Sequence, residues 1–196
     1  MLYIEPAQAC LPLFDRSPLL NIIGITGRAR SGKDTLADYL VEHHGFAKLS
    51  LAGPIRGFIA QLTGLSVEEL TDGPLKEEPL TWLGGITPRR MMQTLGTEWG
   101  RQTICNELWL IVAQRRIERA KREGKTGVVI SDVRFDNEAE FVQNLGGRVV
   151  ELVRPGSAVV EQHVSEAGVD RKWVSASYTN DGPRHQLAHF AAVLAG

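Results

Sequence analysis

The sequence has few cysteines, no long apolar run and almost no net charge. Its 196 residues include two cysteines, Cys10 and Cys105. They are too few and too far apart for a disulfide framework or a zinc site, so we expect reduced thiols in a cytoplasmic protein. No stretch has the length of a membrane span, and residues 1–18 lack the charged start and apolar core of a signal peptide.

The charge balance also excludes a class of partner. A net charge of −1 argues against a surface that coats nucleic acid, which would carry a strong basic excess. We therefore expect no nucleic-acid or membrane partner and a small phosphorylated molecule as the substrate. Hydrophobic residues make up 43% and charged residues 23% of the chain, as in an ordinary globular domain.

A glycine-bounded turn follows the first apolar run of the chain. Gly27 and Gly32 bracket four residues and Lys33 comes next, which is the G-x-x-x-x-G-K spacing of a phosphate-binding loop between a strand and a helix. Glycines let successive N–H groups point at phosphate oxygens, and the following helix directs its positive end to the same place. The predicted nucleotide contacts are Gly27, Arg28, Ala29, Arg30, Ser31, Gly32, Lys33, Asp34 and Thr35.

One position departs from the pattern. The residue after the loop lysine is ordinarily Ser or Thr, which binds Mg²⁺, but here it is Asp34. A carboxylate about 4 Å from a phosphate oxygen repels it by roughly 4 kcal/mol at an effective dielectric near 20, so a cation must intervene. We expect Asp34 to help hold Mg²⁺, directly or through water. The alternative is a structural carboxylate at the start of its helix.

Apolar and amphipathic segments alternate along the rest of the chain. This alternation predicts an α/β fold, a three-layer, doubly wound domain with a parallel five-stranded sheet. Residues 1–18, with three prolines, are predicted to be an N-terminal extension, and residues 19–196 a single domain. Strands are expected at 19–25, 46–51, 128–132, 148–153 and 173–178. Helices are expected at 32–44, 54–64, from Thr87 through Gln93, in a long amphipathic segment that follows to about 123 with Ile104 inward, from 136 or 137 to 145, and at 184–194. Ser66 and Glu69 are expected to form a capping box for a further short helix, and residues 72–85 an exposed loop.

A carboxylate and a set of arginines suggest what the site does. Asp132 ends a short buried strand, where it either helps to hold Mg²⁺ beside the phosphate loop or caps the next turn. Phosphoryl transfer to an anionic acceptor needs cations for two substrates. The chain offers Arg28 and Arg30 in the loop, Arg56, Arg89, Arg90 and Arg101 between the second and third strands, and Arg134 and Arg154 after strand ends.

Several motifs together resemble one known family. They are Thr87-Pro88-Arg89, the Leu-Gly-Thr-Glu segment ending at Glu98 with Arg101, the Asp-Val-Arg-Phe segment from Asp132 with Glu138, and the Gly-Lys-Asp-Thr end of the loop. This set is similar to the deoxynucleoside monophosphate kinases of tailed bacteriophages, and the resemblance runs from Leu20 to the end of the chain. That family also carries Asp after the loop lysine.

The resemblance implies a P-loop kinase fold with ATP and Mg²⁺, and a deoxynucleoside 5′-monophosphate as acceptor. It implies a helical acceptor-binding insertion at about 54–101 and a small lid at about 155–172. The implied roles are catalysis by Lys33, Asp132, Arg134 and Arg30; metal binding by Asp34 and Asp132; base contact or an ordinary turn at Asn180; and acceptor binding by Arg56, Arg89, Gln93, Arg101, Arg134, Glu138, Arg154 and His163.

Two other functions stay open at this stage. Dephospho-coenzyme A kinases and animal-type phosphomevalonate kinases share the loop and topology, and a panel of acceptors separates them. A nucleotide-binding regulator without transfer activity is the other alternative, although the sequence has no Asn-Lys-x-Asp segment for guanine. The bases accepted, the discrimination against ribose, the role of the His163–Glu166 segment and a homodimer are left open.

Overall fold

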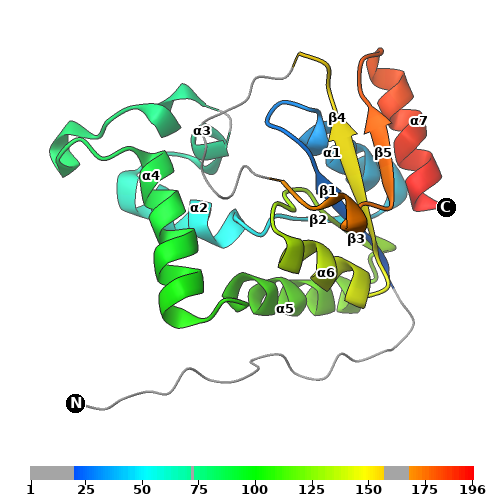
Figure 1. Ribbon diagram of the computed structural model, residues 1–196, viewed down its shortest axis with the longest axis horizontal. Coiled ribbons are helices and arrows are strands. Elements are labelled where there is room, and N and C mark those ends of the chain that lie inside the picture. The colour runs from blue at the N-terminus through cyan, green and yellow to red at the C-terminus, as the bar shows by residue number, and fades with distance from the viewer. Residues whose placement is uncertain (1–19, 72, 157–167) are drawn as a thin grey trace. The chain divides into compact units, whose positions relative to one another are not determined.

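The computed structural model describes residues 20–71, 73–156 and 168–196 (Figure 1). The predicted N-terminal extension and the predicted site residue His163 lie outside the described residues, as does most of the predicted lid. The described residues divide into a helical unit, residues 51–112, and a sheet unit, residues 20–50 and 113–196. The insertion expected at about 54–101 falls within the helical unit. None of the described helices is long and apolar enough to cross a membrane.

The sheet unit contains the predicted five-stranded parallel sheet. Its strands are β1 (Asn21–Thr26), β2 (Ala47–Leu49), β3 (Gly127–Ile130), β4 (Arg148–Val153) and β5 (Ala176–Thr179), in the order β2-β3-β1-β4-β5. All four neighbouring pairs are parallel. The sheet extends from β1 in both directions, which confirms the doubly wound topology, and a crevice for ligands is expected at the carboxyl end of β1.

Both faces of β1 are covered, which explains its mostly apolar sequence. On one face, Ile23 and Ile25 pack with Leu36 of α1 (Lys33–His44) and Leu187 of α7 (Arg184–Ala195). On the other face, Val142 of α6 (Asp136–Asn144) lies against β1, at the position of Gly24. The sheet therefore has helices on both sides, as expected for a parallel sheet.

The helical unit consists of short elements. They are α2 (Gly53–Thr63), α3 (Val67–Thr71), the 3₁₀ turns η1 (Pro74–Glu77) and η2 (Thr81–Leu83), α4 (Pro88–Gln93) and the π-helix η3 (Thr94–Ile104). The predicted caps are confirmed: Ser66 and Glu69 form reciprocal bonds before α3, and the Thr87 side chain accepts from the N–H of Arg90. The segment expected as a plain exposed loop holds the two 3₁₀ turns.

The long helix expected to reach residue 123 is interrupted. The π-helix η3 ends at Ile104, the backbone of Cys105 is extended, and α5 (Leu108–Arg122) then begins separately. Trp109 explains the irregular backbone, because its indole Nε1 donates to the carbonyl of Gly96 at 2.8 Å and its ring lies 2.7 Å from where a Cβ of Gly100 would be. Ile104 was expected to face inward but is 53% exposed, since the π-helix turns its side chain away from the α-helical face.

Two smaller boundaries also differ from the sequence expectation. Neither Asp136 nor Asn137 caps α6; the N-cap is Phe135, and Glu138 supplies the side chain that accepts its N–H. The fifth strand begins at Ala176 rather than Trp173, because residues Arg171–Trp173 form the 3₁₀ turn η5, which Asp170 caps by accepting the N–H of Lys172.

Candidate active site

The phosphate loop lies between β1 and α1, as the sequence predicts. Gly27 and Gly32 adopt φ values of 135° and 103°, which an L side chain rarely adopts. A Cβ on Gly27 would overlap the carbonyl oxygen of Leu152, and one on Gly32 would overlap the side-chain amide of Asn180. Gly32 is the N-cap of α1 and brings no capping side chain. The first turn of α1 thus keeps the character of an anion site.

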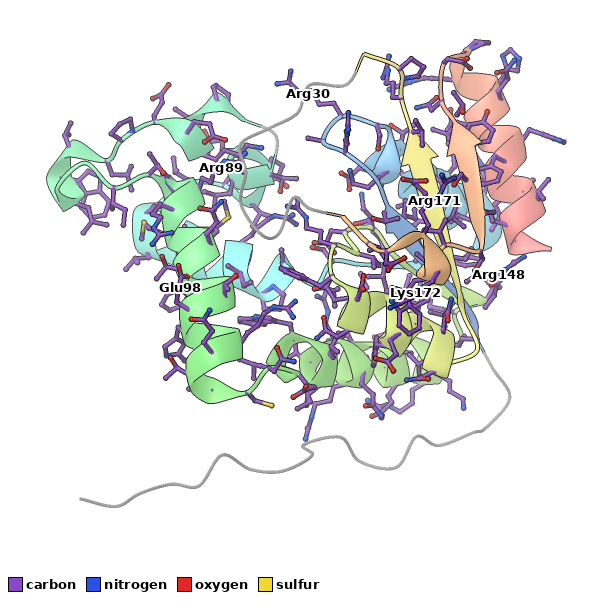
Figure 2. All side chains as sticks on the ribbon, viewed as in Figure 1. Arg30, Arg89, Glu98, Arg148, Arg171 and Lys172 are labelled. Carbon is purple, nitrogen blue, oxygen red and sulfur yellow. The ribbon has the colours of Figure 1, made fainter. Side chains whose placement is uncertain are left out.

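The side chain of Lys33 folds back over the loop. Its Nζ donates to the carbonyl oxygens of Gly27 at 2.8 Å and Arg28 at 2.6 Å. These bonds hold a full positive charge at the mouth of the loop, where the phosphates of a nucleotide would compete for it. Arg28 and Arg30 are exposed, and Arg30 extends outward from the loop at a positive φ of 61° (Figure 2).

Two polar side chains behind the loop fit a bound phosphate chain. The hydroxyl of Ser31 is fully buried and has no hydrogen-bond partner among the described residues. Buried hydroxyls are seldom left unsatisfied without a ligand, water or strain to account for it. The Asn180 side chain donates to the Ser31 carbonyl at 2.8 Å, and its backbone N–H bonds to Val153. The end of β5 therefore holds the back of the loop, and whether Asn180 also contacts the base of the nucleotide or belongs to an ordinary turn stays a prediction.

Asp132 lies where the carboxyl ends of three strands meet. It follows β3, and the N–H groups beside it bond to neighbouring strands: Ser131 to the carbonyl of Leu49 and Val133 to that of Ile25. The carboxylate is 7% exposed and accepts a bond of 2.5 Å from the hydroxyl of Ser50, the residue after β2. The end of β3 that carries Asp132 thus lies next to the end of β1, from which the phosphate loop starts.

Ser50 is a site residue that the sequence reasoning did not single out. The carbonyl of Ser50 accepts from Nη1 of Arg116 in α5 at 3.2 Å, while its hydroxyl holds Asp132. A signal was present, because Ser50 is a polar residue next to the last position of the second predicted strand, as Asp132 is at the last position of the third. Polar residues at the carboxyl ends of adjacent parallel strands are brought together by the sheet.

Glu138 stabilises the backbone that presents Arg134. It is 3% exposed, and its Oε2 accepts the N–H groups of Arg134 at 2.7 Å and Phe135 at 3.1 Å. This bonding ties the start of α6 to the residues that follow Asp132. Arg134 is thus fixed two residues from the buried carboxylate, whereas Glu138 is committed to the helix start.

Asp34 is paired with a lysine from the sheet. Its Oδ1 lies 2.8 Å from Nζ of Lys48, the central residue of β2, and the same ammonium lies 2.8 Å from Oδ1 of Asp38. The sequence predicts Mg²⁺ or a purely structural role for Asp34, and it carries no motif that marks Lys48 as its partner. Asp34 and Asp38 are four residues apart and so lie on one side of α1.

The remaining predicted acceptor residues are distributed over both units. Arg56 belongs to α2, Arg89 and Gln93 to α4, and Arg101 to η3 in the helical unit, whereas Arg154 follows β4 in the sheet unit. Nε of Arg89 donates to Glu77 at 2.5 Å. Near it, Arg90 pairs with Glu98 at 3.3 Å. The roles predicted for the helical-unit residues remain predictions.

The donor set of the sheet unit suits magnesium held together with phosphates. Among the described residues, no three His, Cys, Asp or Glu side chains cluster into a metal site. Mg²⁺ at phosphoryl-transfer sites uses one or two carboxylates, and substrate phosphates with water supply the rest of its shell. Buried Asp132, with the orphaned Ser31 hydroxyl and the Gly27–Gly32 loop that would receive phosphates, fits such a site.

Comparisons with known proteins identify the family. A family profile described as deoxynucleotide monophosphate kinase matches residues 21–77 and 76–189. A relative from Acanthamoeba polyphaga mimivirus is 36% identical over 160 residues, which cover 74% of this chain and 80% of the relative. The deoxynucleotide monophosphate kinase of Enterobacteria phage T4 is 23% identical over 230 residues, covering 86% of this chain and 95% of the phage protein.

A solved structure supports the fold. TT1252 from Thermus thermophilus matches with a TM-score of 0.53 and 20% identity over 91% of this chain and 98% of its own. At that identity the likeness concerns the fold alone, an α/β domain of the same topology class. Because the family profile spans most of the chain, including the phosphate loop and the Asp132–Glu138 segment, this protein belongs to the deoxynucleotide monophosphate kinase family.

Proposed function

We propose that this chain transfers the γ-phosphoryl group of ATP to a deoxynucleoside 5′-monophosphate and releases ADP and the deoxynucleoside diphosphate. The observation that carries the phosphoryl-transfer chemistry is the meeting of a phosphate loop with a buried, hydrogen-bonded carboxylate at adjacent strand ends. The acceptor class rests on family membership. The name of the phage T4 relative states that it acts on deoxynucleotide monophosphates. We extend this acceptor class to the present chain because the chain shares the motifs of that family.

The phosphate loop would bind ATP, the phosphoryl donor. Its backbone N–H groups and the start of α1 bind the phosphates, while Lys33 and Arg30 offset the charge that spreads over the migrating group. In the transfer, an oxygen of the acceptor phosphate forms a bond to the γ-phosphorus. The bond from that phosphorus to the β,γ-bridging oxygen breaks, and its electron pair stays with ADP.

Asp132, with Asp34, would hold Mg²⁺. When bound, the ion neutralises phosphate charge and fixes the phosphates in line for displacement. Ser50 orients the Asp132 carboxylate through the 2.5 Å bond. Arg134 would bind the acceptor phosphate through its planar fork of donors, and Arg56, Arg89, Gln93, Arg101 and Arg154 are the further candidates for that substrate.

A panel of acceptors tests this proposal. Purified protein is mixed with ATP and Mg²⁺ and with each deoxyribonucleoside or ribonucleoside monophosphate, or with dephospho-coenzyme A, and ADP formation is followed. We expect ADP and a deoxynucleoside diphosphate in equal amounts with at least one deoxynucleotide, and no more than background with dephospho-coenzyme A. The Lys33→Ala variant is the control for contaminating kinases. A preference for ribonucleotides or for dephospho-coenzyme A would reject the proposed acceptor.

A further inference from the structure

Asp34 creates an electrostatic problem at the nucleotide end of α1. The carboxylate sits in the first turn of the helix, next to Lys33, where the phosphate loop would hold three or four negative phosphate charges. Half of the side chain is exposed, so solvent screens it only in part. A protein that binds a polyanion at this place needs a compensating positive charge that stays in position before any metal arrives.

Lys48 supplies a charge with that geometry. It projects from β2 to Oδ1 of Asp34 and Oδ1 of Asp38, each at 2.8 Å, and only a third of its side chain is exposed. Both carboxylates lie at hydrogen-bond distance from the ammonium, and charge-assisted bonds of this kind hold it in place. One lysine spans the first two turns of α1 from a strand of the sheet.

We propose that Lys48 is a positioning residue for the donor site: its ammonium neutralises Asp34 and fixes that carboxylate, so the phosphates of ATP can occupy the start of α1. This inference rests on the proposed function only in taking ATP as the donor. Lys33 reaches the phosphates itself, whereas Lys48 acts through Asp34. The alternative role for Lys48 is a structural tie between β2 and α1, which would affect stability without affecting nucleotide binding.

Equilibrium binding of ATP in EDTA measures the effect without the metal and without turnover. Four proteins are compared by calorimetry: the wild type, Lys48→Met, Asp34→Asn and the double variant. We expect Lys48→Met to weaken ATP binding by about tenfold or more, because the Asp34 charge is then left facing the phosphates. In the Asp34→Asn background, the same lysine substitution should change the dissociation constant by less than about twofold, since the charge it offsets is gone. Lys48→Arg should restore binding.

Asp38 provides a matched control. Asp38→Asn removes a carboxylate that pairs with the same Lys48 ammonium, but this carboxylate lies one helical turn farther from the loop than Asp34. It should leave ATP binding in EDTA within about twofold of the wild type, whereas Asp34→Asn should tighten binding. Circular dichroism melts of all variants report any loss of stability separately from binding.

The outcomes discriminate between the possible roles. Equal weakening by Lys48→Met with and without Asp34 would mean that the lysine touches the phosphates directly and would overturn the proposal. If Lys48→Met melts at a lower temperature but binds ATP as the wild type does, Lys48 only connects β2 to α1 and the proposal is wrong. If the wild type binds no ATP at all, the proposed function fails together with this inference; if it binds ATP and Lys48→Met binds equally well, only the inference fails.

Discussion

The bond between Ser50 and Asp132 can be tested by removing one hydroxyl. In Ser50→Ala the carboxylate of Asp132, buried at the end of β3, loses a donor at 2.5 Å and gains no replacement from the methyl group. The distance lies at the short end of the range for a hydroxyl bonded to a carboxylate. Hydrogen bonds to charged groups contribute roughly 1.5–3 kcal/mol.

A loss of about 2 kcal/mol has two measurable consequences. For a domain of this size it lowers the melting temperature by roughly 4–8 °C. If the same bond also fixes Asp132 for Mg²⁺, the Mg²⁺ concentration for half-maximal turnover rises, and kcat falls by up to about thirtyfold, since 1.4 kcal/mol corresponds to a factor of ten. The Michaelis constant for the acceptor should change little.

A second serine provides the control. Ser177 of β5 donates to Glu151 of β4 at 2.9 Å, which is also a serine bonded to a carboxylate across neighbouring strands, but on the exposed surface. Ser177→Ala should leave both the Mg²⁺ titration and kcat unchanged, and Ser50→Thr should recover most of the activity. If Ser50→Ala melts lower but shows a wild-type Mg²⁺ titration, Ser50 stabilises the fold and does not orient the metal site.

Three further predictions concern single side chains. Lys33→Ala should leave the circular dichroism spectrum unchanged but reduce turnover by at least about a hundredfold, because it removes the charge that stabilises the migrating phosphoryl group; turnover within tenfold of the wild type would contradict this role. Arg134→Lys keeps the charge but loses the two-donor fork, so kcat/KM for the acceptor should fall sharply while the Michaelis constant for ATP barely moves; the opposite pattern in steady-state kinetics would assign Arg134 to the donor. Hydrogen bonding from Asn106 lowers the pKa of Glu107 below its ordinary value, so the stability it contributes is present above about pH 4.5 and is lost as the pH falls through the folded-state pKa. Melts of Glu107→Gln should therefore show a small deficit at pH 7 that shrinks as the pH falls below about 4.5, and a deficit that stays constant over the titration would refute the assignment.

The parts of the fold that follow from local pattern could be predicted from the sequence. The apolar run of β1, the glycine spacing of the loop and the capping box of Ser66 and Glu69 each depend on residues close together in the chain. The π-helix η3 could not be predicted, because Trp109 lies beyond it in the chain and contacts it in two places, with the indole N–H bonded to the Gly96 carbonyl and the ring packed at Gly100. No helical periodicity encodes such a contact.

The candidate site shows the same division. Lys33 and Asp132 are carried by motifs with a known spacing, so both were found. Lys48 and Ser50 lie on or just after a strand of three residues and carry no motif; their partners are 10 and 82 positions away along the chain. Their roles depend on the strand order β2-β3-β1, in which a later strand is inserted between two earlier ones. Sequence spacing gives no information about such an insertion.

That inserted strand also sets the order in which the protein matures on the ribosome. β1 and β2 lie close together in the chain, yet they are not neighbours in the sheet. Each pairs with β3, which is synthesised much later: Asn21 pairs with Gly127 and Ala47 with Val128. At roughly 5–20 residues per second, the phosphate loop leaves the ribosome roughly 5–20 s before its own strand gains a hydrogen-bonded neighbour. The nucleotide-binding motif is thus translated first and completed late, and a nascent chain released before residue 127 would carry the whole motif without forming the site.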